Sequence, residues 1–193
     1  MSAAHISESV SKIHCPAVSL PPIITCRPGV PCACPGGCYA LKAWCMYEDT
    51  REAWSANLHT ATTEPAAFFD SIITYLHTRR RPRRFFRWHP SGEVFSQAYA
   101  NGIMRVARAC PTTRFLVYTK QTGIDWRRAP ANLTIRYSQW PGMRAHGRGP
   151  RAWVADPAQP DRRIPREAYH CPGDCSRCRV CWSPLPNVVF NKH

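Results

Sequence analysis

The stretch RFFRWHPSGEVFSQAYANGIMRVARACPTTRFLVYTK, residues 84–120, decides the fold class. Its residue pattern predicts a strand over 84–89, a turn over 90–93, a helix over 94–109 and a second strand over 115–120. A strand, a helix and another strand in succession form the unit from which parallel sheets are built. We therefore predict an α/β fold with a mostly parallel sheet.

Elements of the same kinds flank this unit on both sides. The pattern predicts further helices over 39–58 and from Thr63 onward, and further strands at IITC (23–26), LTIRYSQW (133–140), AWVAD (152–156) and NVVF (187–190). Residues 1–22 are polar and then interrupted by prolines, so we expect an arm laid over the body. Residues 23–193 are expected to form one compact α/β metal-binding domain.

The charge of the chain predicts an anionic partner. Its formal net charge is +14, with 26 Lys and Arg against 12 Asp and Glu. Most of the cations are arginines, whose planar fork suits phosphate groups and stacks on bases. Nucleic acid is therefore an expected partner, with Trp126 and Trp140 available for base stacking, although codon bias in a GC-rich genome explains the same composition.

The cysteine count and the hydropathy predict a cytoplasmic location without a membrane partner. No apolar run approaches the roughly 20 residues that cross a bilayer. The opening MSAAHISESVSKIHC (1–15) lacks the apolar core of a secretory signal, and the 11 cysteines are odd in number. We therefore expect reduced thiols that are available to metals.

The first cysteine set predicts a metal site. Cys26, Cys32, Cys34 and Cys38 lie in a loop rich in Gly and Pro, which can fold tightly around a cluster. If all four bind, the site is closed and structural. If only three bind, one iron stays open to a substrate or cofactor, as the fourth position of a catalytic zinc site does.

The second cysteine set, Cys171, Cys175, Cys178 and Cys181, is more compact. Spacings of two and three residues are typical of iron–sulfur loops, whereas zinc sites more often split into two separated pairs. The set predicts a second iron–sulfur cluster, with zinc as the alternative, or a single cluster shared by both cysteine sets. Cys15 and Cys110 are isolated in the sequence and are expected to be inert.

Polar residues at the predicted strand ends are candidates for a substrate rim, because ligands bind at the carboxyl ends of parallel strands. His89 and Glu93 are a candidate acid/base pair, and Lys120 is a candidate to hold an anionic group. A capping Glu and a surface Lys are the alternatives for the last two. The candidate cofactor-binding residues at the same rim are Arg87, Tyr118 and Ser138.

Four motifs in this order resemble a bacteriophage family, the gene product eighty-eight family. They are the TC at Cys26 with the CYA that begins at Cys38, then FRWHPSGEVFS (86–96), VYTK (117–120), and a closing CSRCRVCW followed by VVFNKH. The resemblance spans about Pro21 to His193, and it implies a host-cytoplasmic phage protein.

The CYA ending and the strand motif are also similar to a neighbouring phage family that is related to radical S-adenosylmethionine proteins. This similarity implies a partial (β/α) barrel with a [4Fe-4S] cluster in the loop after the first strand. Cys34 and Cys38 would hold the cluster, with Cys26, which the TC motif favours, or Cys32 as the third ligand. The chain lacks the C-x3-C-x2-C spacing there, and 193 residues are too few for a full barrel of about 250.

Taken together, these patterns predict an iron–sulfur protein with one or two [4Fe-4S] clusters and radical or redox chemistry at an open iron, with S-adenosylmethionine as a candidate cofactor. The alternative is a nucleic-acid-binding protein without catalysis, in which iron–sulfur or zinc only stabilises the fold.

Overall fold

A seven-stranded sheet forms the centre of the computed structural model, which describes residues 3–9, 12–26, 38–78, 82–144 and 147–191. All neighbouring strands are parallel, and their order is β1-β2-β3-β4-β5-β7-β6. The bounds are β1 Ala17–Val18, β2 Phe85–Trp88, β3 Arg114–Thr119, β4 Leu133–Gln139, β5 Arg151–Ala155, β6 Tyr169–His170 and β7 Val188–Asn191. The predicted α/β class with a mostly parallel sheet is confirmed, and the first five strands follow chain order as in a partial (β/α) barrel.

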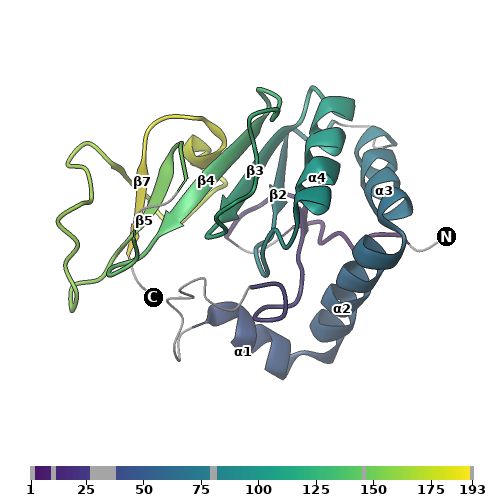
Figure 1. Ribbon diagram of the computed structural model, residues 1–193, viewed down its shortest axis with the longest axis horizontal. Helices are drawn as coiled ribbons and strands as arrows, with labels where there is room; N and C mark the ends of the chain where they lie inside the picture. Colours follow the sequence, from purple (N-terminus) through teal and green to yellow (C-terminus); the bar gives the residue numbers. More distant parts are fainter. Residues whose placement is uncertain (1–2, 10–11, 27–37, 79–81, 145–146, 192–193) are drawn as a thin grey trace.

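The described helices gather mainly on one side of this sheet (Figure 1). Their bounds are α1 Tyr39–Met46, α2 Glu48–Thr63, α3 Pro65–His77, α4 Gln97–Ala109 and the one-turn 3-10 helix η1 Val180–Trp182. Pro65 stands at the first turn of α3, where its missing N–H costs nothing. Ser96 caps α4, because its hydroxyl oxygen accepts from the Tyr99 N–H at 3.1 Å.

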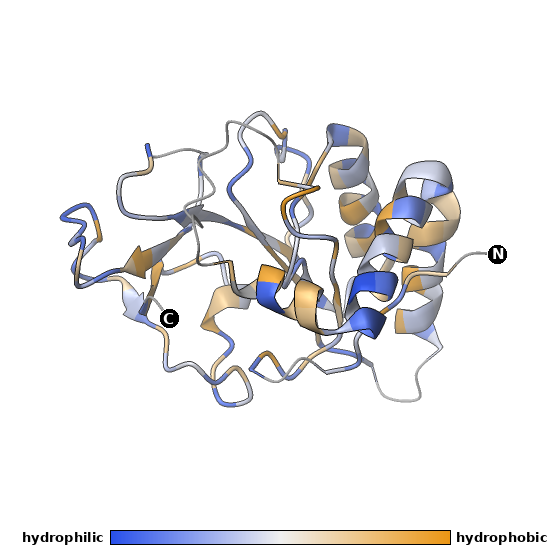
Figure 2. Cartoon of the chain, turned by 90° about the horizontal axis from the view of Figure 1, so that it is seen from below, coloured by the Kyte–Doolittle hydropathy of each residue, from blue (hydrophilic) through white to orange (hydrophobic). Residues whose placement is uncertain are grey.

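The side of the sheet that faces α3 and α4 carries the larger apolar core. Alternate residues of β2 and β3, Phe86, Trp88, Phe115 and Val117, pack against apolar side chains of the two helices. The helices carry both apolar and polar residues along their length (Figure 2). Gly102 lets α4 approach α3 closely, because a Cβ at this position would lie 1.9 Å from Phe69 Cε2. The strand and helix faces predicted for residues 84–120 therefore meet in one core.

The opposite side of the sheet, which we name the inner face, is covered by both ends of the described chain. Ile13 and Cys15 pack there with Leu116 of β3 and with Cys181 and Trp182 of the C-terminal segment. In Figure 1 that segment, in yellow-green, lies on the side of the sheet away from α3 and α4. The inner face is therefore buried by irregular chain and by the one-turn helix η1, and not by α1 to α4.

Two predicted elements differ in the structure. Residues 23–26 form a turn instead of a strand, because the Cys26 N–H donates to the Ile23 carbonyl and Ile23 has φ of +65°. The first strand is β1, inside the segment that was expected to be an arm. The helix predicted over 39–58 is two helices, since Tyr47 is extended and acidic residues at 48 and 49 favour a new helix start.

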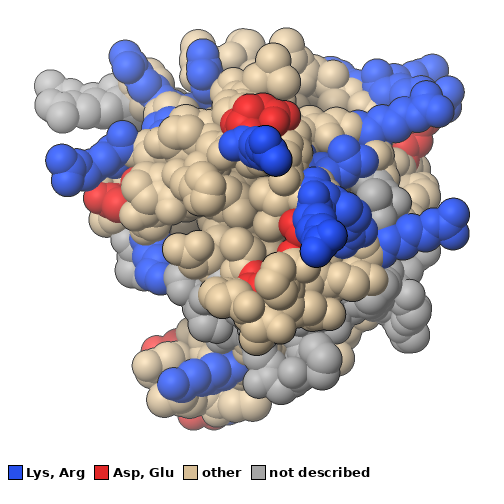
Figure 3. Space-filling view, turned by 90° about the vertical axis from the view of Figure 1, so that its left-hand side faces the viewer, with Lys and Arg blue, Asp and Glu red and all other residues tan. Residues whose placement is uncertain are grey.

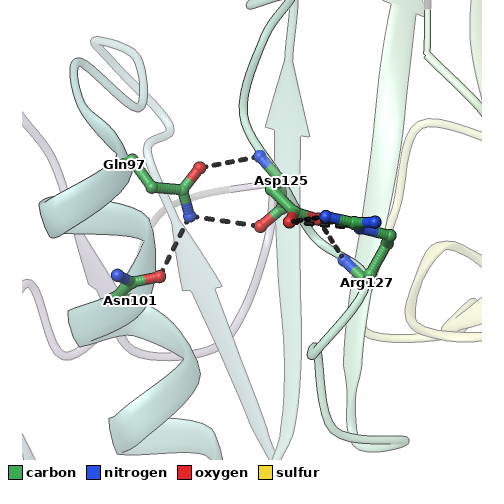
Figure 4. Close-up of polar contacts among 4 residues, drawn as sticks. All are labelled: Gln97, Asn101, Asp125 and Arg127. Carbon is green, nitrogen blue, oxygen red and sulfur yellow. Dashed lines mark hydrogen bonds and ion pairs between the residues drawn. The ribbon is translucent and has the colours of Figure 1, made fainter.

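The connection that leaves β3 is fixed to the first turn of α4 (Figure 4). The Gln97 side chain donates to Asn101 Oδ1 at 2.9 Å and to the Asp125 carbonyl at 3.2 Å, and its oxygen accepts from the Asp125 N–H at 2.7 Å. Arg127 forms an ion pair with Asp125 at 2.7 Å and thereby holds the pKa of that carboxyl at about 2.

Candidate functional site

Three polar side chains from adjacent strands lie together on the inner face. Arg87 of β2, Tyr118 of β3 and Arg136 of β4 belong to the set of alternate residues that faces away from α3 and α4. The Arg87 guanidinium carbon lies 4.6 Å from the centre of the Tyr118 ring, which is a cation–π distance. The structure thus brings together two of the three predicted cofactor-binding residues.

The third, Ser138, is half-buried. It lies two residues beyond Arg136 along β4, where it pairs with Ala152 of β5. Alternation places its side chain on the inner face as well. No described hydrogen bond joins it to Arg87 or Tyr118.

Arg136 fastens the C-terminal segment to the sheet. It is fully buried, and its guanidinium donates to the carbonyls of Val180 at 3.2 Å, Cys181 at 2.9 Å, Ser183 at 2.7 Å and Pro186 at 2.8 Å. Four carbonyl dipoles around one guanidinium satisfy most of its donors. Residues 180–186, which include Cys181, the last cysteine of the second set, are therefore held against the sheet.

Cys175 and Cys181 of the second cysteine set lie on the inner face beside these strands. Both belong to the apolar cluster that contains Tyr118, and the Tyr118 hydroxyl donates to the Cys181 sulfur. Burial raises the pKa of the Cys175 thiol to about 11, with the neighbouring Cys181 adding to the rise and Arg87 opposing it. Burial also raises the pKa of Cys181, against the hydrogen bond from Tyr118 and the charge of Arg136.

The other two cysteines of this set are half-buried and nearer to solvent. The Cys171 sulfur accepts from the Gly173 N–H at 3.4 Å, and the Cys178 thiol donates to the Tyr169 hydroxyl at 3.5 Å. Cys171 acts electrostatically on both Cys175 and Cys181, so these three thiols share one neighbourhood.

The donor chemistry fits a soft metal, although the free thiols do not stand at ligating positions. Within the described ranges, no three His, Cys, Asp or Glu side chains are arranged to hold a metal ion. The Arg87 Nε is buried and has no hydrogen-bond partner among the described residues. A buried donor of this kind beside several thiols matches a site that carries negative charge when metal is bound.

The first cysteine set is described only in part. Cys32 and Cys34, two of its four predicted ligands, lie outside the described residues. Cys26 is half-buried in the turn after β1, and Cys38, also half-buried, immediately precedes α1. This predicted metal site therefore stays a prediction.

Glu93 joins the carboxyl ends of the first three strands. Its carboxylate accepts from the Thr119 hydroxyl at 2.8 Å and from the Lys120 N–H at 2.9 Å, and its own N–H donates to Thr25 Oγ1 at 3.0 Å. Burial raises the pKa of Glu93, and the positive charge of Lys120 opposes that rise. The structure thus places two of the three predicted catalytic residues together, and Glu93 is bonded to Thr25, the residue that precedes Cys26 in the chain.

His89, the third predicted catalytic residue, turns toward α4. Its Nε2 lies 3.0 Å from the Tyr99 hydroxyl, and its backbone adopts φ of +55° just after β2. Burial lowers the pKa of His89 to about 3, with Arg87 contributing, so the ring is neutral near pH 7. No hydrogen bond among the described residues joins His89 to Glu93, so their pairing as acid and base stays a prediction.

A comparison with protein families identifies the chain. A family model described as Gene product 88 matches residues 2–184. The chain belongs to the gene product 88 family. The match includes all four cysteines of the second set, and neither the curated proteins nor the solved structures give a significant match. The resemblance to the gene product eighty-eight family is thereby confirmed.

In this gene product 88 family member, none of the described helices combines the length and the apolar character that crossing a membrane requires. Sequence analysis missed Arg136, although an arginine between Ile135 and Tyr137 in a strand pattern signals a buried or interface role. It also expected Cys15 to be inert, because no sequence signal connects that residue to the distant C-terminal cysteines.

Proposed function

We propose that this gene product 88 protein is an iron–sulfur protein whose C-terminal cysteines bind a metal centre on the inner face of the sheet. The observation that carries the proposal is the meeting of Cys175 and Cys181 with Arg87 and Tyr118. Thiols from a compact cysteine run lie beside a guanidinium whose Nε has no partner among the described residues. The spacing of the run favours iron–sulfur over zinc.

Charge balance supports a negatively charged centre at this place. Four cysteine thiolates around a [4Fe-4S] core or a zinc ion leave a net charge of about −2. Arg87 acts electrostatically on Cys175 and Cys181, and Arg136 acts on Cys181. Such cations offset the cost of placing a negative centre in a partly buried site.

Metal binding requires small movements of the thiols. Rotation of a cysteine side chain between staggered χ1 wells moves its sulfur by about 3 Å, because only one bond has to turn. The raised pKa of Cys175 means that its proton leaves only when the metal takes its place, so binding releases protons.

We also propose that radical or redox chemistry belongs to the first cysteine set at the carboxyl edge of the sheet. An iron–sulfur cluster, when bound, supplies one-electron chemistry. Support comes from Glu93, which is tied to Thr25 beside Cys26 and to the end of β3. Its buried carboxyl and the neighbouring Lys120 would orient a substrate and hold a proton next to that loop.

Metal analysis of anaerobically purified protein tests both proposals. Iron, sulfide and zinc contents are measured, and electron paramagnetic resonance spectra are recorded on the reduced protein. The wild type is compared with two double variants, Cys175→Ala with Cys181→Ala and Cys26→Ala with Cys38→Ala, and with the single variant Cys110→Ala. We expect iron and sulfide in the wild type, with each double variant losing its own signal.

Cys110 is the matched control, because it is buried on the helix side of the sheet and away from both sets. Its variant should keep the wild-type metal content. Zinc without sulfide would replace the iron–sulfur proposal by a structural zinc site. Wild-type protein without any metal would refute the proposal.

A second candidate function, nucleic-acid binding, is favoured by the surface charge. Figure 3 shows Lys and Arg side chains projecting at many points of one face, with fewer Asp and Glu. Arg144 and Arg148, two exposed residues between β4 and β5, have no ion-pair partner among the described residues. Fluorescence anisotropy with single-stranded DNA and RNA tests this candidate.

Affinity for these strands should fall steeply with added salt, and Arg144→Gln with Arg148→Gln should weaken it. Arg105→Gln is the matched control, because Arg105 is exposed but paired with Asp70 at 2.8 Å. Binding that is absent at low salt would exclude this function.

A further inference from the structure

Two connections of the chain are fastened to each other beside β5. The first connection joins β4 to β5, and the second connection joins β5 to β6. Arg163 of the second connection donates to the Met143 carbonyl at 2.5 Å and to the Trp140 carbonyl at 3.5 Å, both of which belong to the first. Arg163 also forms an ion pair with Asp161 at 2.6 Å, which fixes its guanidinium within the second connection. The described parts of the two connections therefore form one surface.

The first connection is also anchored to the sheet at two points. Met143 is only 4 % exposed, and its carbonyl accepts from the side chain at the end of β4 at 2.8 Å. The Gly147 backbone packs directly on the Tyr137 ring, because a Cβ at this glycine would lie 2.2 Å from a ring carbon. Arg144 follows the first anchor and Arg148 follows the second. Both arginines therefore leave the surface from fixed backbone positions.

The surface has more cations than acids to pair with them. The two connections contain five arginines and three acidic residues. Of these acids Asp161 is paired with Arg163, and only Glu167 is exposed. Figure 3 views this end of the molecule and shows Lys and Arg side chains projecting from it. The arginines that are exposed and have no ion-pair partner among the described residues are Arg144, Arg148, Arg162 and Arg166.

Aromatic rings stand at both ends of this surface. Trp140, which begins the first connection, is half-buried, and Tyr169, which follows the second, is 37 % exposed. Bases of a single strand are free to stack on such rings, whereas a duplex keeps its bases stacked on one another. Exposed guanidinium groups bind the phosphates between those bases. Arginines flanked by aromatic rings therefore favour a single strand over a duplex.

We propose that the two connections form a binding surface for single-stranded nucleic acid, with the four exposed arginines on its phosphates and with Trp140 and Tyr169 on its bases. The inference rests on the proposed nucleic-acid binding, and it names the surface and the form of the strand. Arg163 is a positioning residue, because its bonds hold the two connections together. Contacts to phosphates and base faces do not depend on sequence.

Fluorescence anisotropy of the full-length protein over a range of salt concentrations tests the proposal. The probes are a labelled single-stranded DNA of mixed sequence, the same sequence as RNA, and the DNA annealed to its complement. Arg162→Gln with Arg166→Gln is compared with Arg114→Gln with Arg128→Gln. The second pair is the matched control, because both of its arginines are exposed and lie toward the amino ends of β3 and β4, whereas the first connection leaves the carboxyl end of β4.

Both the affinity and its salt dependence should change in the Arg162→Gln, Arg166→Gln protein. Each phosphate contact to a single strand contributes about 0.7 to the slope of log affinity against log salt, so the loss of two contacts should reduce the slope by about 1.4. At about 0.1 M salt this corresponds to about 25-fold weaker binding. The control pair should stay within about threefold of the wild type, since it removes the same charge from outside the surface.

Stacking is tested separately from charge at Trp140. Trp140→Leu should bind at least about fivefold more weakly with an unchanged salt slope, because it removes a ring and no charge. Trp140→Phe keeps a ring and should stay within about twofold of the wild type. Equal binding by Trp140→Leu and the wild type would overturn the stacking that we infer.

The remaining outcomes separate this inference from nucleic-acid binding in general. Equal affinities and slopes for the two double variants would overturn the inference and leave nucleic-acid binding standing. Tighter binding of the duplex than of the single strands would overturn it as well, and so would equally tight binding of vesicles made of anionic lipid. Wild-type protein that binds none of the three nucleic acids at low salt would overturn both.

Discussion

Replacement of Arg136 by methionine should destabilise the protein strongly and release the C-terminal segment. The side chain is fully buried and donates to four backbone carbonyls of residues 180–186. A hydrogen bond from a charged donor contributes about 1.5–3 kcal/mol, but bonds made by one group do not add fully. Methionine keeps the apolar stem and leaves four acceptors without their donor.

We therefore expect Arg136→Met to lower the free energy of unfolding by about 4 kcal/mol, because each buried carbonyl left without a donor costs about 1–3 kcal/mol and the four costs do not add fully. Urea denaturation followed by circular dichroism measures the loss, at the same metal content in both proteins. Arg105→Met is the control, because its ion pair with Asp70 is about half exposed and should contribute less than about 1 kcal/mol.

Hydrogen exchange separates this effect from general destabilisation. Amides of residues 180–183 and of Leu185 should lose protection in Arg136→Met under conditions where those of β2 and β3 keep theirs. A loss of less than about 1 kcal/mol, or equal protection of residues 180–186 in both proteins, would show that the guanidinium does not fasten this segment.

Three further substitutions test other features by urea denaturation. Gly102→Ala should lower the free energy of unfolding by about 1–3 kcal/mol, because the new methyl group would collide with Phe69. At a solvent-exposed helical glycine the same change would raise it by about 1 kcal/mol. A rise for Gly102→Ala would therefore contradict the close packing of α3 and α4. The pKa of His89 is lowered from 6.5 to about 3, so protonation of the unfolded chain should reduce stability as pH falls through this range, and His89→Asn should reduce that dependence; an unchanged slope would argue against a buried neutral ring. The pKa of Glu93 is raised from 4.5 in the folded protein, so the free energy of unfolding should fall as pH rises from 4.5 toward the folded-state pKa. Glu93→Gln should make this fall shallower. If the pH dependence of stability is the same in both proteins, burial does not perturb the carboxyl.

The βαβ unit of residues 84–120 could be predicted because each of its elements is long enough to show a period. In β2 the buried Phe86 and Trp88 lie on either side of Arg87, and the apolar residues of α4 recur at helical spacing. β1 and β6 are each only two residues long, which is too short to show an alternating pattern, so neither could be recognised from its own sequence. β1 becomes a strand only because β2 pairs with it.

The types of residue in the site could be predicted from the sequence, but which of them contact one another could not. The spacing of Cys171, Cys175, Cys178 and Cys181 indicated a common neighbourhood, and the strand ends indicated that Arg87 and Tyr118 would be neighbours. Tertiary packing decides which side of the sheet the Arg87 and Tyr118 side chains face. In the structure they face the side on which the second cysteine set lies. Cys15 joins that neighbourhood through contacts between segments that are distant in the chain, and local patterns carry no information on such contacts.

The way in which the inner face is covered has a consequence for the order of events during synthesis. Strands β1 to β4 and helices α1 to α4 leave the ribosome before the segment that contains Cys175, Cys181 and Trp182. Until that segment arrives, Leu116 lacks the part of its cover that Cys181 and Trp182 provide, and the Arg136 guanidinium lacks its four carbonyl acceptors. The nascent protein is therefore most exposed to aggregation just before its last stretch is made, and chains that terminate before residue 180 should depend on chaperones.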